Sequence, residues 1–578
     1  MRDSRKPAVS GHRFARALWR LLRIYWTSPD AKKGALLLAL AIGLELATVY
    51  ANVLVADASR RAGDALADRS VEAFATAMAL VLAFTVAVLL ASTYRIYLRQ
   101  LLEVRWRRSV TAHYLERWIG PESYLQAEMH RGEMDNPDQR IAEDIRDFVA
   151  SALGLSLSLL AAIVTLLSFG GILWRLSGDW PLAVGSVHVR VPGFMLWVAV
   201  LYALVAMWIT HIVGRCLVPI NFDKLRFEAD FRYGLVRFRD NIEAVALSNG
   251  QTEERRGALE RFGSVVENWR QLIRAQRNLM LFTTGFGQLN GLVPLLLAAP
   301  SYFAGLLTLG AVAQARIAYG QVSGSLTWFV SAYQEIARWR ASIERLSTFA
   351  EMMDTTQAEF ERGEKIRIAV GDERLRLVDL KLRLPDGRVV LDRVNAAIAP
   401  GERVAVLGPS GVGKTTLIRA IAGIWPFGSG RIERPADMLV LPQRPYLPIG
   451  SLRAVLSYPA AAGTFTDDQI VKALRLLDLD HLRARLDSTE PWDQELSAPE
   501  QQRLALARVL LHEPGWILLD EATSGLDEAL EQEIYELLTK QLPRAAVMTV
   551  SHRPALARYH QRSWTLARKD GRVTFAAG

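Results

Sequence analysis

Long apolar segments constrain the fold of this chain more than any other feature of its sequence. A helix needs about 20 predominantly apolar residues to cross the hydrocarbon core of a bilayer. We predict six such membrane helices, at residues 34–56, 73–97, 148–174, 193–218, 279–307 and 311–333. The sixth segment carries four polar or charged residues, which are Gln314, Arg316, Gln321 and Ser323. We expect a membrane helix of this composition to face a protein interior or a wet cavity.

Basic residues predict which ends of these helices face the cytoplasm. The first 33 residues form an arm rich in Arg and Lys, and the long segments 98–147 and 219–278 are rich in Arg. Cytoplasmic loops carry an excess of these residues, so we expect all three segments, and after six crossings the C-terminus, to be cytoplasmic. The arm has no obvious cleavage site and is interpreted as cytoplasmic. We assign the net charge of +9 to loops that face anionic lipid rather than to a nucleic-acid partner.

The apolar segments also predict the domain organisation. We expect an N-terminal arm at residues 1–33, a transmembrane domain at 34–350, a linker at 351–365 and a soluble domain at 366–578. The two long inner segments can extend helices well beyond the bilayer, at about 1.5 Å per residue. The single cysteine, Cys216, excludes an intramolecular disulfide framework and a cysteine-based metal cluster.

A glycine-rich motif in the soluble domain predicts a phosphate-binding loop. The segment Gly408-Pro-Ser-Gly-Val-Gly-Lys-Thr415 follows a strand pattern at 403–407 and opens a helix pattern at 415–422. Glycines let backbone N–H groups approach phosphate oxygens, and the helix N-terminus favours an anion. Lys414 should reach the β- and γ-phosphates of ATP, and Thr415 should bind Mg²⁺. The predicted nucleotide-binding residues here are Gly408, Pro409, Ser410, Gly411, Val412, Gly413, Lys414, Thr415 and Thr416.

A second apolar strand pattern, at 516–519, ends in two acidic residues. Asp520 would hold Mg²⁺ directly or through water, and Glu521 would polarise the water that attacks the γ-phosphate. An apolar run followed by Asp-Glu is a weak signal alone. It becomes a strong one together with the phosphate-binding loop upstream.

Four further segments resemble motifs of the ATP-binding cassette (ABC) family, in the order and spacing of that family. They are Gln443, Leu496-Ser-Ala-Pro-Glu-Gln-Gln-Arg503, Ser524-Gly-Leu-Asp527 and Ser551-His552-Arg553. The resemblance covers residues 366–578 and implies an α/β P-loop NTPase domain fused to an α-helical membrane domain of the exporter-type ABC fold. It implies that Gln443 senses Mg²⁺ and that His552 is a switch histidine. Contacts with ATP are implied for Ser497, Glu500 and Asp527.

The segment at 496–503 resembles the ABC signature and implies a dimer. In this family the signature closes over the γ-phosphate of ATP held by the opposite subunit, so a homodimer with two composite ATP sites is expected. The usual signature has two glycines after the serine, whereas this chain has Ala498 and Pro499. Proline has no N–H to offer a phosphate. We therefore expect slow or tightly coupled hydrolysis.

The membrane half resembles SbmA/BacA-like transporters and the peroxisomal subfamily D of ABC transporters. The resemblance lies in Trp106-Arg107-Arg108 with Thr111, Tyr114 and Trp118, in Asp135-Asn-Pro-Asp-Gln-Arg-Ile-Ala-Glu-Asp144, in Glu228-Ala-Asp-Phe-Arg232 and in Arg239-Asp-Asn-Ile-Glu243. Asn136-Pro137 predicts a turn and helix cap. SbmA/BacA-like proteins with a fused ATPase act in uptake of diverse hydrophilic cargo, including peptides, peptide antibiotics and cobalamin.

The resemblance favours ATP-driven import of hydrophilic cargo, and the Ala- and Arg-rich composition without a transit peptide fits a bacterial inner membrane. Two other readings stay open: a lipid or fatty-acyl transporter, and a membrane-tethered ATPase that senses or regulates. A buried charge bears on the choice, because Glu45 lies near the middle of the first apolar segment. Glu45 either pairs with an arginine, lines a cavity or takes part in proton coupling.

Overall fold

A computed structural model describes residues 11–120, 136–177, 179–184, 187–362, 365–371, 373–569 and 572–578. Its contacts divide the chain into two compact units. The first, here called the helical unit, comprises the described residues up to Leu115 and from Asn136 to Phe349. The second, here called the sheet unit, comprises mainly those from Ala350 onward. Asp135 and the first ten residues of the arm lie outside the described residues.

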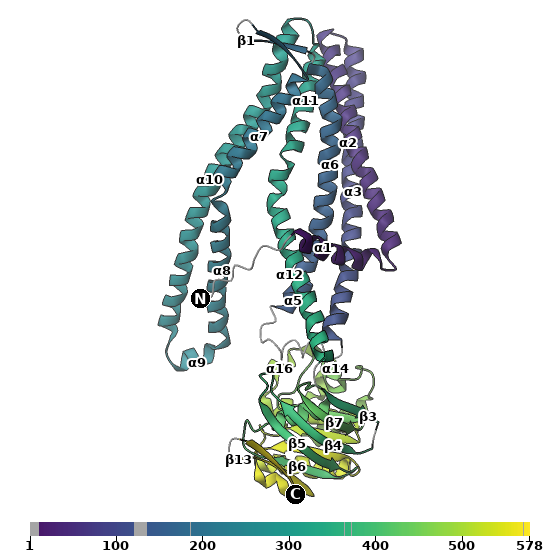
Figure 1. Cartoon of the computed structure of the whole chain (residues 1–578), viewed down its shortest axis with the longest axis vertical. Coiled ribbons are helices and arrows are strands. Elements are labelled where there is room, and N and C mark those ends of the chain that lie inside the picture. Colours follow the sequence, from purple (N-terminus) through teal and green to yellow (C-terminus); the bar gives the residue numbers. More distant parts are fainter. Residues whose placement is uncertain are drawn as a thin grey trace. The chain divides into compact units, whose positions relative to one another are not determined.

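The helical unit is built from long helices and one short hairpin (Figure 1). Its elements are α1 (Gly11–Trp26), α2 (Ala31–Ala67), α3 (Val71–Ile119), α5 (Pro137–Gln139), the π-helix η1 (Arg140–Asp144), α6 (Ile145–Ser177), β1 (Asp179–Val184), β2 (Val187–Pro192), α7 (Phe194–Gly214), α8 (Leu217–Asp240), α9 (Ile242–Leu247), α10 (Gln251–Phe303), α11 (Leu309–Leu326) and α12 (Trp328–Arg362). The β1–β2 hairpin follows no pattern that we recognised in the sequence.

Five segments of the described chain are long and apolar enough to cross a membrane. They are α2, α3, the stretch Pro137–Ser177, α7 and α10. The predicted count of six is not reached, because the segment 311–333 is divided at Thr327 between α11 and α12 and the polar residues of α11 lower its hydropathy. Helix α11 contacts α2, α6, α7 and α10, and it buries Gln314 and Ser323. The expectation that these polar side chains face a protein interior is therefore confirmed, although Arg316 on the same helix is exposed.

Helices α8 and α10 form a long hairpin that is closed by the short helix α9 (Figure 1). This arrangement confirms that the inner segment 219–278 forms two extended helices with a short helix between them. A small apolar cluster of Leu217, Leu272 and Ala275 joins the two helices. Large apolar side chains elsewhere on the hairpin are exposed, among them Leu225, Tyr233 and Leu247.

Glu45 lies on α2 and forms an ion pair with Arg95 on α3. Only 3% of the Glu45 surface is exposed. A buried carboxylate requires a charged or hydrogen-bonding partner, and Arg95 provides one. Of the three interpretations of Glu45, pairing with an arginine is the one that the structure confirms.

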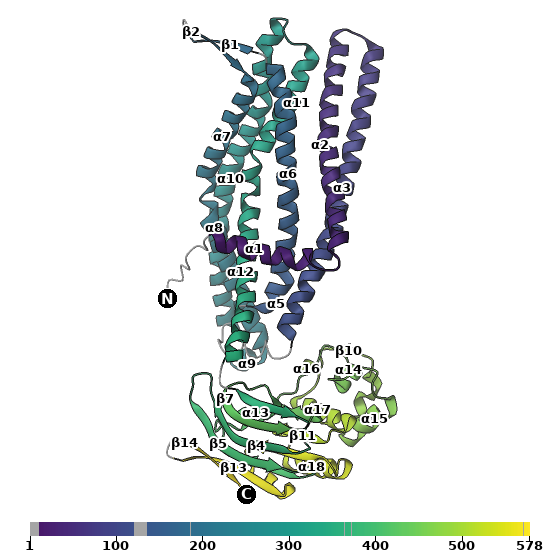
Figure 2. The same cartoon turned by 45° about the vertical axis from the view of Figure 1, so that its right-hand side comes forward.

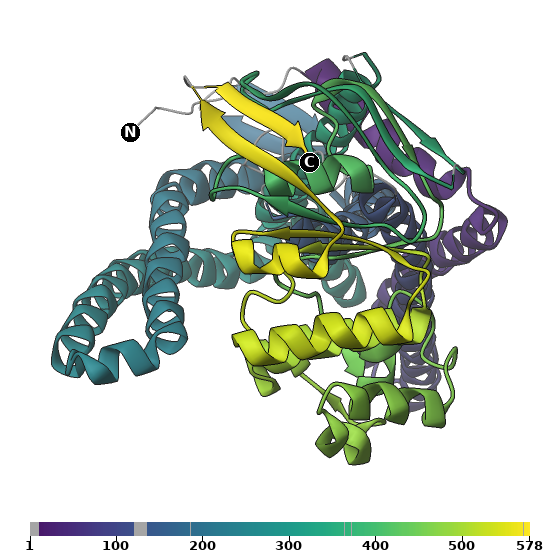
Figure 3. The ribbon, with the colours of Figure 1, turned by 90° about the horizontal axis from the view of Figure 1, so that it is seen from below.

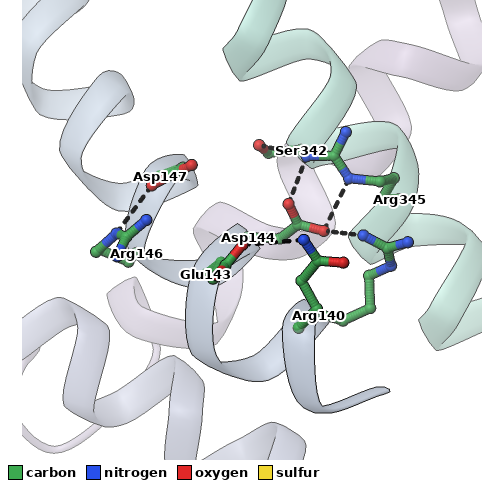
Figure 4. Close-up of polar contacts among 8 residues, drawn as sticks. Arg140, Glu143, Asp144, Arg146, Asp147, Ser342 and Arg345 are labelled. Carbon is green, nitrogen blue, oxygen red and sulfur yellow. Dashed lines mark hydrogen bonds and ion pairs between the residues drawn. The ribbon is translucent and has the colours of Figure 1, made fainter. Parts of the chain in front are cut away.

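The segment from Asn136 to Asp144 forms an ionic junction between α6 and α12. Asn136 precedes the helix with φ +40° and Pro137 takes the first helical turn, as predicted, although the Asn136 side chain makes no capping hydrogen bond. The buried Asp144 carboxylate accepts a hydrogen bond of 2.7 Å from Arg140 and a bidentate pair from Arg345 on α12 (Figure 4). Two arginines thus neutralise one buried carboxylate at this junction.

The sheet unit contains a six-stranded sheet in the order β14-β13-β6-β12-β11-β8 and a four-stranded sheet in the order β3-β7-β4-β5. The strands are β3 (Ile366–Val370), β4 (Leu375–Arg383), β5 (Val389–Ile398), β6 (Arg403–Leu407), β7 (Gly428–Arg434), β8 (Met438–Leu441), β9 (Gly450–Ser451), β10 (Thr489–Glu490), β11 (Trp516–Asp520), β12 (Ala546–Ser551), β13 (Arg562–Lys569) and β14 (Arg572–Ala577). Strands β6, β12, β11 and β8 are parallel, and β11 and β12 are buried throughout. The β13–β14 hairpin carries the C-terminus (Figure 3).

Helices complete the sheet unit (Figure 2). They are α13 (Lys414–Ala422), α14 (Leu452–Ser457), α15 (Asp467–Leu476), the 3₁₀ helix η2 (Asp480–Arg485), α16 (Trp492–Glu495), α17 (Ala498–His512), α18 (Glu528–Gln541) and the 3₁₀ helix η3 (Pro554–Tyr559). The predicted linker at 351–365 is largely helical, because α12 continues to Arg362. The carboxyl ends of the parallel strands place the predicted site residues along one edge of the sheet.

Candidate nucleotide-binding site

The glycines of the loop between β6 and α13 are required by its backbone. Gly408, Gly411 and Gly413 all have positive φ, at +156°, +73° and +107°. A Cβ on Gly413 would come within 2.2 Å of Val390 Cγ1, and one on Gly408 within 2.4 Å of the Leu566 carbonyl oxygen. The loop therefore excludes side chains at these positions and leaves its backbone open to a ligand.

Lys414 begins α13 and is buried. Its ammonium group donates to the carbonyl oxygens of Gly408 at 2.7 Å and Pro409 at 3.0 Å. The same nitrogen lies 4.0 Å from a Glu521 carboxylate oxygen. The lysine charge is therefore held over the loop, where a triphosphate would be neutralised.

Thr415 and Asp520 lie together beneath this loop. The Thr415 hydroxyl donates to Asp520 Oδ1 at 3.2 Å. Burial, and secondarily the neighbouring charge of Glu521, raises the pKa of Asp520, although the Thr415 hydrogen bond acts in the opposite direction. A hydroxyl and a carboxylate are oxygen donors of the kind that Mg²⁺ prefers beside substrate phosphates. These two residues fit a shared Mg²⁺ site.

Glu521 is the point at which the other predicted catalytic residues meet. Gln443 donates from its amide to Glu521 Oε2 at 3.2 Å, and His552 Nδ1 lies 3.7 Å from Glu521 Oε1. Glu521 itself has φ +51°, a backbone conformation that costs a non-glycine residue about 1–3 kcal/mol. Its N–H is fixed by the Val550 carbonyl oxygen at 3.1 Å. The carboxylate is thus aimed at the loop from a constrained turn.

The signature residues lie at the start of α17, and in the described chain no hydrogen bond or ion pair joins them to the phosphate-binding loop. Ser497 caps the helix, and its N–H and hydroxyl donate to Glu500 Oε2 at 2.9 Å and 2.6 Å. These hydrogen bonds lower the pKa of the Glu500 carboxyl. Pro499 occupies the first turn, where a helix tolerates proline. The turn is therefore well formed despite the unusual residue.

Asp527 is likewise placed as a helix cap. It precedes α18, and its carboxylate accepts from the Leu530 N–H at 2.8 Å. The segment 524–527, here called the D-loop, follows directly from Glu521, because the Ser524 N–H donates to the Glu521 carbonyl oxygen at 3.0 Å. Three residues contact this region without having been assigned a role from the sequence: Gln502 and Arg553, which lie within the segments 496–503 and 551–553, and Glu531, which lies outside all the motifs. Nothing in the spacing of the sequence signals their contacts, which depend on the fold.

Comparison with protein families assigns both parts of the chain. A family described as ABC transporter transmembrane region 2 matches residues 21–303, and a family described as ABC transporter matches residues 391–524. The second match includes the phosphate-binding loop, Asp520 and Glu521. Both predicted parts, a helical membrane region and an ABC ATPase domain, are therefore confirmed.

Several named relatives are similar along most of their length. YddA, an inner membrane ABC transporter ATP-binding protein of Escherichia coli, is 32% identical over 95% of each chain. The chloroplastic ABC transporter D family member 2 of Arabidopsis thaliana is 31% identical over 94% of this chain and 85% of its own. The mouse lysosomal cobalamin transporter ABCD4 is 25% identical over 82% and 81% of the two chains.

Proposed function

Because this chain belongs to the ABC transporter family, with relatives in its D subfamily, we propose that it is a homodimeric importer of hydrophilic solutes. ATP-driven transport follows from family membership. Direction, cargo and homodimer are our proposals. They correspond to an SbmA/BacA-like importer in a bacterial inner membrane with both termini cytoplasmic, and YddA is a similar inner-membrane protein.

We assign the site residues to the hydrolysis of ATP. Lys414 binds the β- and γ-phosphates, while Thr415 and Asp520 hold Mg²⁺ with Gln443 nearby. Glu521 orients and polarises the attacking water, and His552 stabilises the γ-phosphate. The convergence of three of these side chains on the Glu521 carboxylate supports this assignment.

The homodimer is supported by exposed surface on the α8–α10 hairpin. Leu225, Tyr233 and Leu247 are 71%, 69% and 78% exposed, and all lie in the Arg-rich segment that we place outside the bilayer. An apolar surface of this kind in water marks an interaction site. Ser497 and Asp527, which we expect to act on the partner's ATP, also need a second copy.

The proposal of hydrophilic cargo is based on one face of α11. Arg316, Gly320 and Gly324 follow one another at helical spacing and are exposed, while the opposite side of α11 packs among four helices. A Cβ added at either glycine would meet no atom within 4 Å. An arginine within a membrane segment is costly unless it faces water, a partner or a ligand. We infer that this open face lines the cargo path.

The cobalamin transporter among the relatives makes cobalamin one test cargo. The exposed arginine argues against the first alternative in the form of a wholly apolar lipid path, whereas a fatty acyl-CoA, whose phosphates can pair with an arginine, has to be tested as a cargo of its own. The second alternative, a tethered ATPase that senses or regulates, would hydrolyse ATP without moving any cargo.

Transport into or out of proteoliposomes tests the proposal. Full-length protein is reconstituted with labelled cobalamin, a cationic peptide or an acyl-CoA inside or outside the vesicles. Mg-ATP added outside drives only copies whose ATPase faces outward, so an importer releases cargo from the lumen and an exporter accumulates it. ATP-dependent release of cobalamin or peptide, absent in Glu521→Gln, is expected. The proposal would be overturned if only acyl-CoA moved, if cargo accumulated in the vesicle lumen, or if ATP were hydrolysed while no cargo moved.

The α11 face gives the matched pair of variants. Arg316→Gln should slow release of the cargo several-fold and leave ATP hydrolysis without cargo unchanged. Arg338→Gln, an exposed arginine on α12, should transport like the unmodified protein. Equal transport by both variants would show that the α11 face does not line the path.

A further inference from the structure

The backbone of the D-loop is held by side chains from two other segments. The Gly525 N–H donates to Gln502 Oε1 at 3.1 Å. From the other side, Arg553 donates to the carbonyl oxygens of Ser524 at 3.2 Å and Leu526 at 3.3 Å. Backbone groups of three consecutive residues, in two peptide units, are therefore bound by two side chains that are distant in sequence.

Gln502 connects three motifs through one amide. It lies on α17, the helix that begins at the signature, and its side chain is buried. Its oxygen accepts from the D-loop, while its nitrogen donates to the Gln443 carbonyl oxygen at 3.4 Å. A Cβ on Gly525 would come within 3.0 Å of the Gln502 oxygen. The helix, the D-loop and the loop that carries Gln443 are thus in direct contact.

Arg553 is anchored by a buried carboxylate. Glu531 on α18 is 3% exposed and accepts from Arg553 at 3.0 Å and from the Thr523 hydroxyl at 2.6 Å. Charge-assisted hydrogen bonds to a buried carboxylate hold their geometry well. Since Arg553 follows His552 in the chain, this anchor ties the switch histidine segment to the D-loop.

We propose that Gln502 and Arg553 are positioning residues that make the D-loop move together with the signature helix and the His552 segment. The D-loop is bonded to the Glu521 carbonyl group, so its displacement shifts the residue that orients the attacking water. The catalytic carboxylate then reaches its hydrolytic position only when the signature helix is aligned. A further consequence rests on the homodimer of the proposed function: ATP closed under the signature of one copy would act on Glu521 of that same copy.

The proposal predicts a loss of rate without a loss of ATP binding. In full-length protein in nanodiscs, Gln502→Met and Arg553→Gln should lower kcat by about 10- to 100-fold, the usual scale for a misplaced catalytic group. The KM for ATP and the binding of a fluorescent ATP analogue should change less than about twofold, because within the described part of the chain the hydrogen bonds of both residues go to other segments than the phosphate-binding loop. Glu531→Gln should behave like Arg553→Gln.

A graded variant and two matched controls separate positioning from stability. Gln502→Glu keeps the acceptor for Gly525 and loses the donor to Gln443, so its kcat should fall between Gln502→Met and the unmodified protein. The controls Gln532→Ala and Arg558→Ala remove exposed residues from α18 and η3 and should leave kcat unchanged. If Gln502→Met does not fold, the kcat of Gln502→Glu tests the proposal in its place. An unchanged kcat in folded variants, or a loss explained by weaker ATP binding, overturns the proposal.

The dependence of the ATPase rate on ATP concentration tests the dimer in the same experiment. A Hill coefficient above 1 for ATP in the unmodified protein, falling toward 1 in the Gln502 variants, supports coupling between two copies. A coefficient of 1 throughout, with the loss of kcat retained, would remove the coupling between copies and leave the positioning roles standing. The failure of the homodimer and the failure of this inference are therefore distinguishable.

Discussion

Pro499 sets the number of backbone donors at the start of α17. It fits the first turn of that helix, so the residue removes an N–H without disturbing the fold. We expect Pro499→Gly to raise kcat by about tenfold, because one hydrogen bond to a charged group contributes about 1.5 kcal/mol. ATPase rates of purified protein give the measurement.

Pro499→Ala serves as the control for backbone flexibility. Alanine restores the N–H without the conformational freedom of glycine. Both variants should therefore hydrolyse ATP faster. If neither does so while folding correctly, the missing donor does not limit hydrolysis.

His560 makes the stability of the sheet unit depend on pH. Its Nδ1 lies 2.8 Å from the Leu556 carbonyl oxygen and its Nε2 lies 2.9 Å from the Thr549 hydroxyl. Burial lowers the pKa of this imidazole. The unfolded chain therefore binds a proton more readily, and stability should be lost as the pH falls below the ordinary histidine value of about 6.5.

Thermal unfolding of the full-length protein at pH 7.5, 6.5 and 5.5 checks this dependence. His560→Asn should show a smaller decrease in melting temperature on acidification than the unmodified protein. His12→Asn, which removes an exposed histidine on α1, should show the same decrease as the unmodified protein. An identical decrease in His560→Asn would contradict the prediction.

An ion pair between the segment preceding α6 and helix α12 joins these two elements. Asp144 stands in the π-helical turn before α6 and is bound by Arg345 on α12 (Figure 4). Asp144→Asn should lower stability by about 3 kcal/mol, because it removes the charge of a buried carboxylate that two arginines bind. Thermal unfolding measures the loss.

The chain offers a neighbouring control for this junction. Asp147→Asn removes an exposed carboxylate that pairs with Arg146, and it should change stability by less than about 1 kcal/mol. Adding Arg345→Gln to Asp144→Asn should cost little more than Asp144→Asn alone, since both changes break one interaction. If the stability losses of Asp144→Asn and Arg345→Gln added up in the double variant, the two residues would not act in one shared interaction.

At the scale of the whole molecule, the homodimer that we propose, with its two composite ATP sites, predicts that ATP hydrolysis in one copy depends on the other copy. Differently tagged copies of the unmodified protein and Glu521→Gln, co-expressed in equal amounts, form mixed dimers by chance. If each dimer needs both sites, the ATPase rate should fall to about a quarter of the unmodified rate, whereas independent sites would retain about half. Mixing with Gln532→Ala should leave the rate unchanged. A rate near half would mean that the copies hydrolyse independently.

The sequence by itself determined the two-part architecture and the chemistry of the ATPase. Apolar length and the spacing of a glycine-rich loop are local properties, so the helices and the roles of Lys414 and Asp520 could be predicted without knowing contacts. Hydropathy alone does not define the sixth membrane helix, because α11 is polar and packs among four other helices.

Only the tertiary structure decided which distant side chains meet. Arg95 reaches Glu45, Arg345 reaches Asp144, and Gln502 reaches Gly525. None of these pairs has a spacing that a helix or strand would impose. Each depends on packing that brings separate elements together, and the burial that results makes the pairing of their charges and amides obligatory. The residues to which we assign chemistry could therefore be proposed from the sequence, whereas the side chains that contact them could be identified only in the structure.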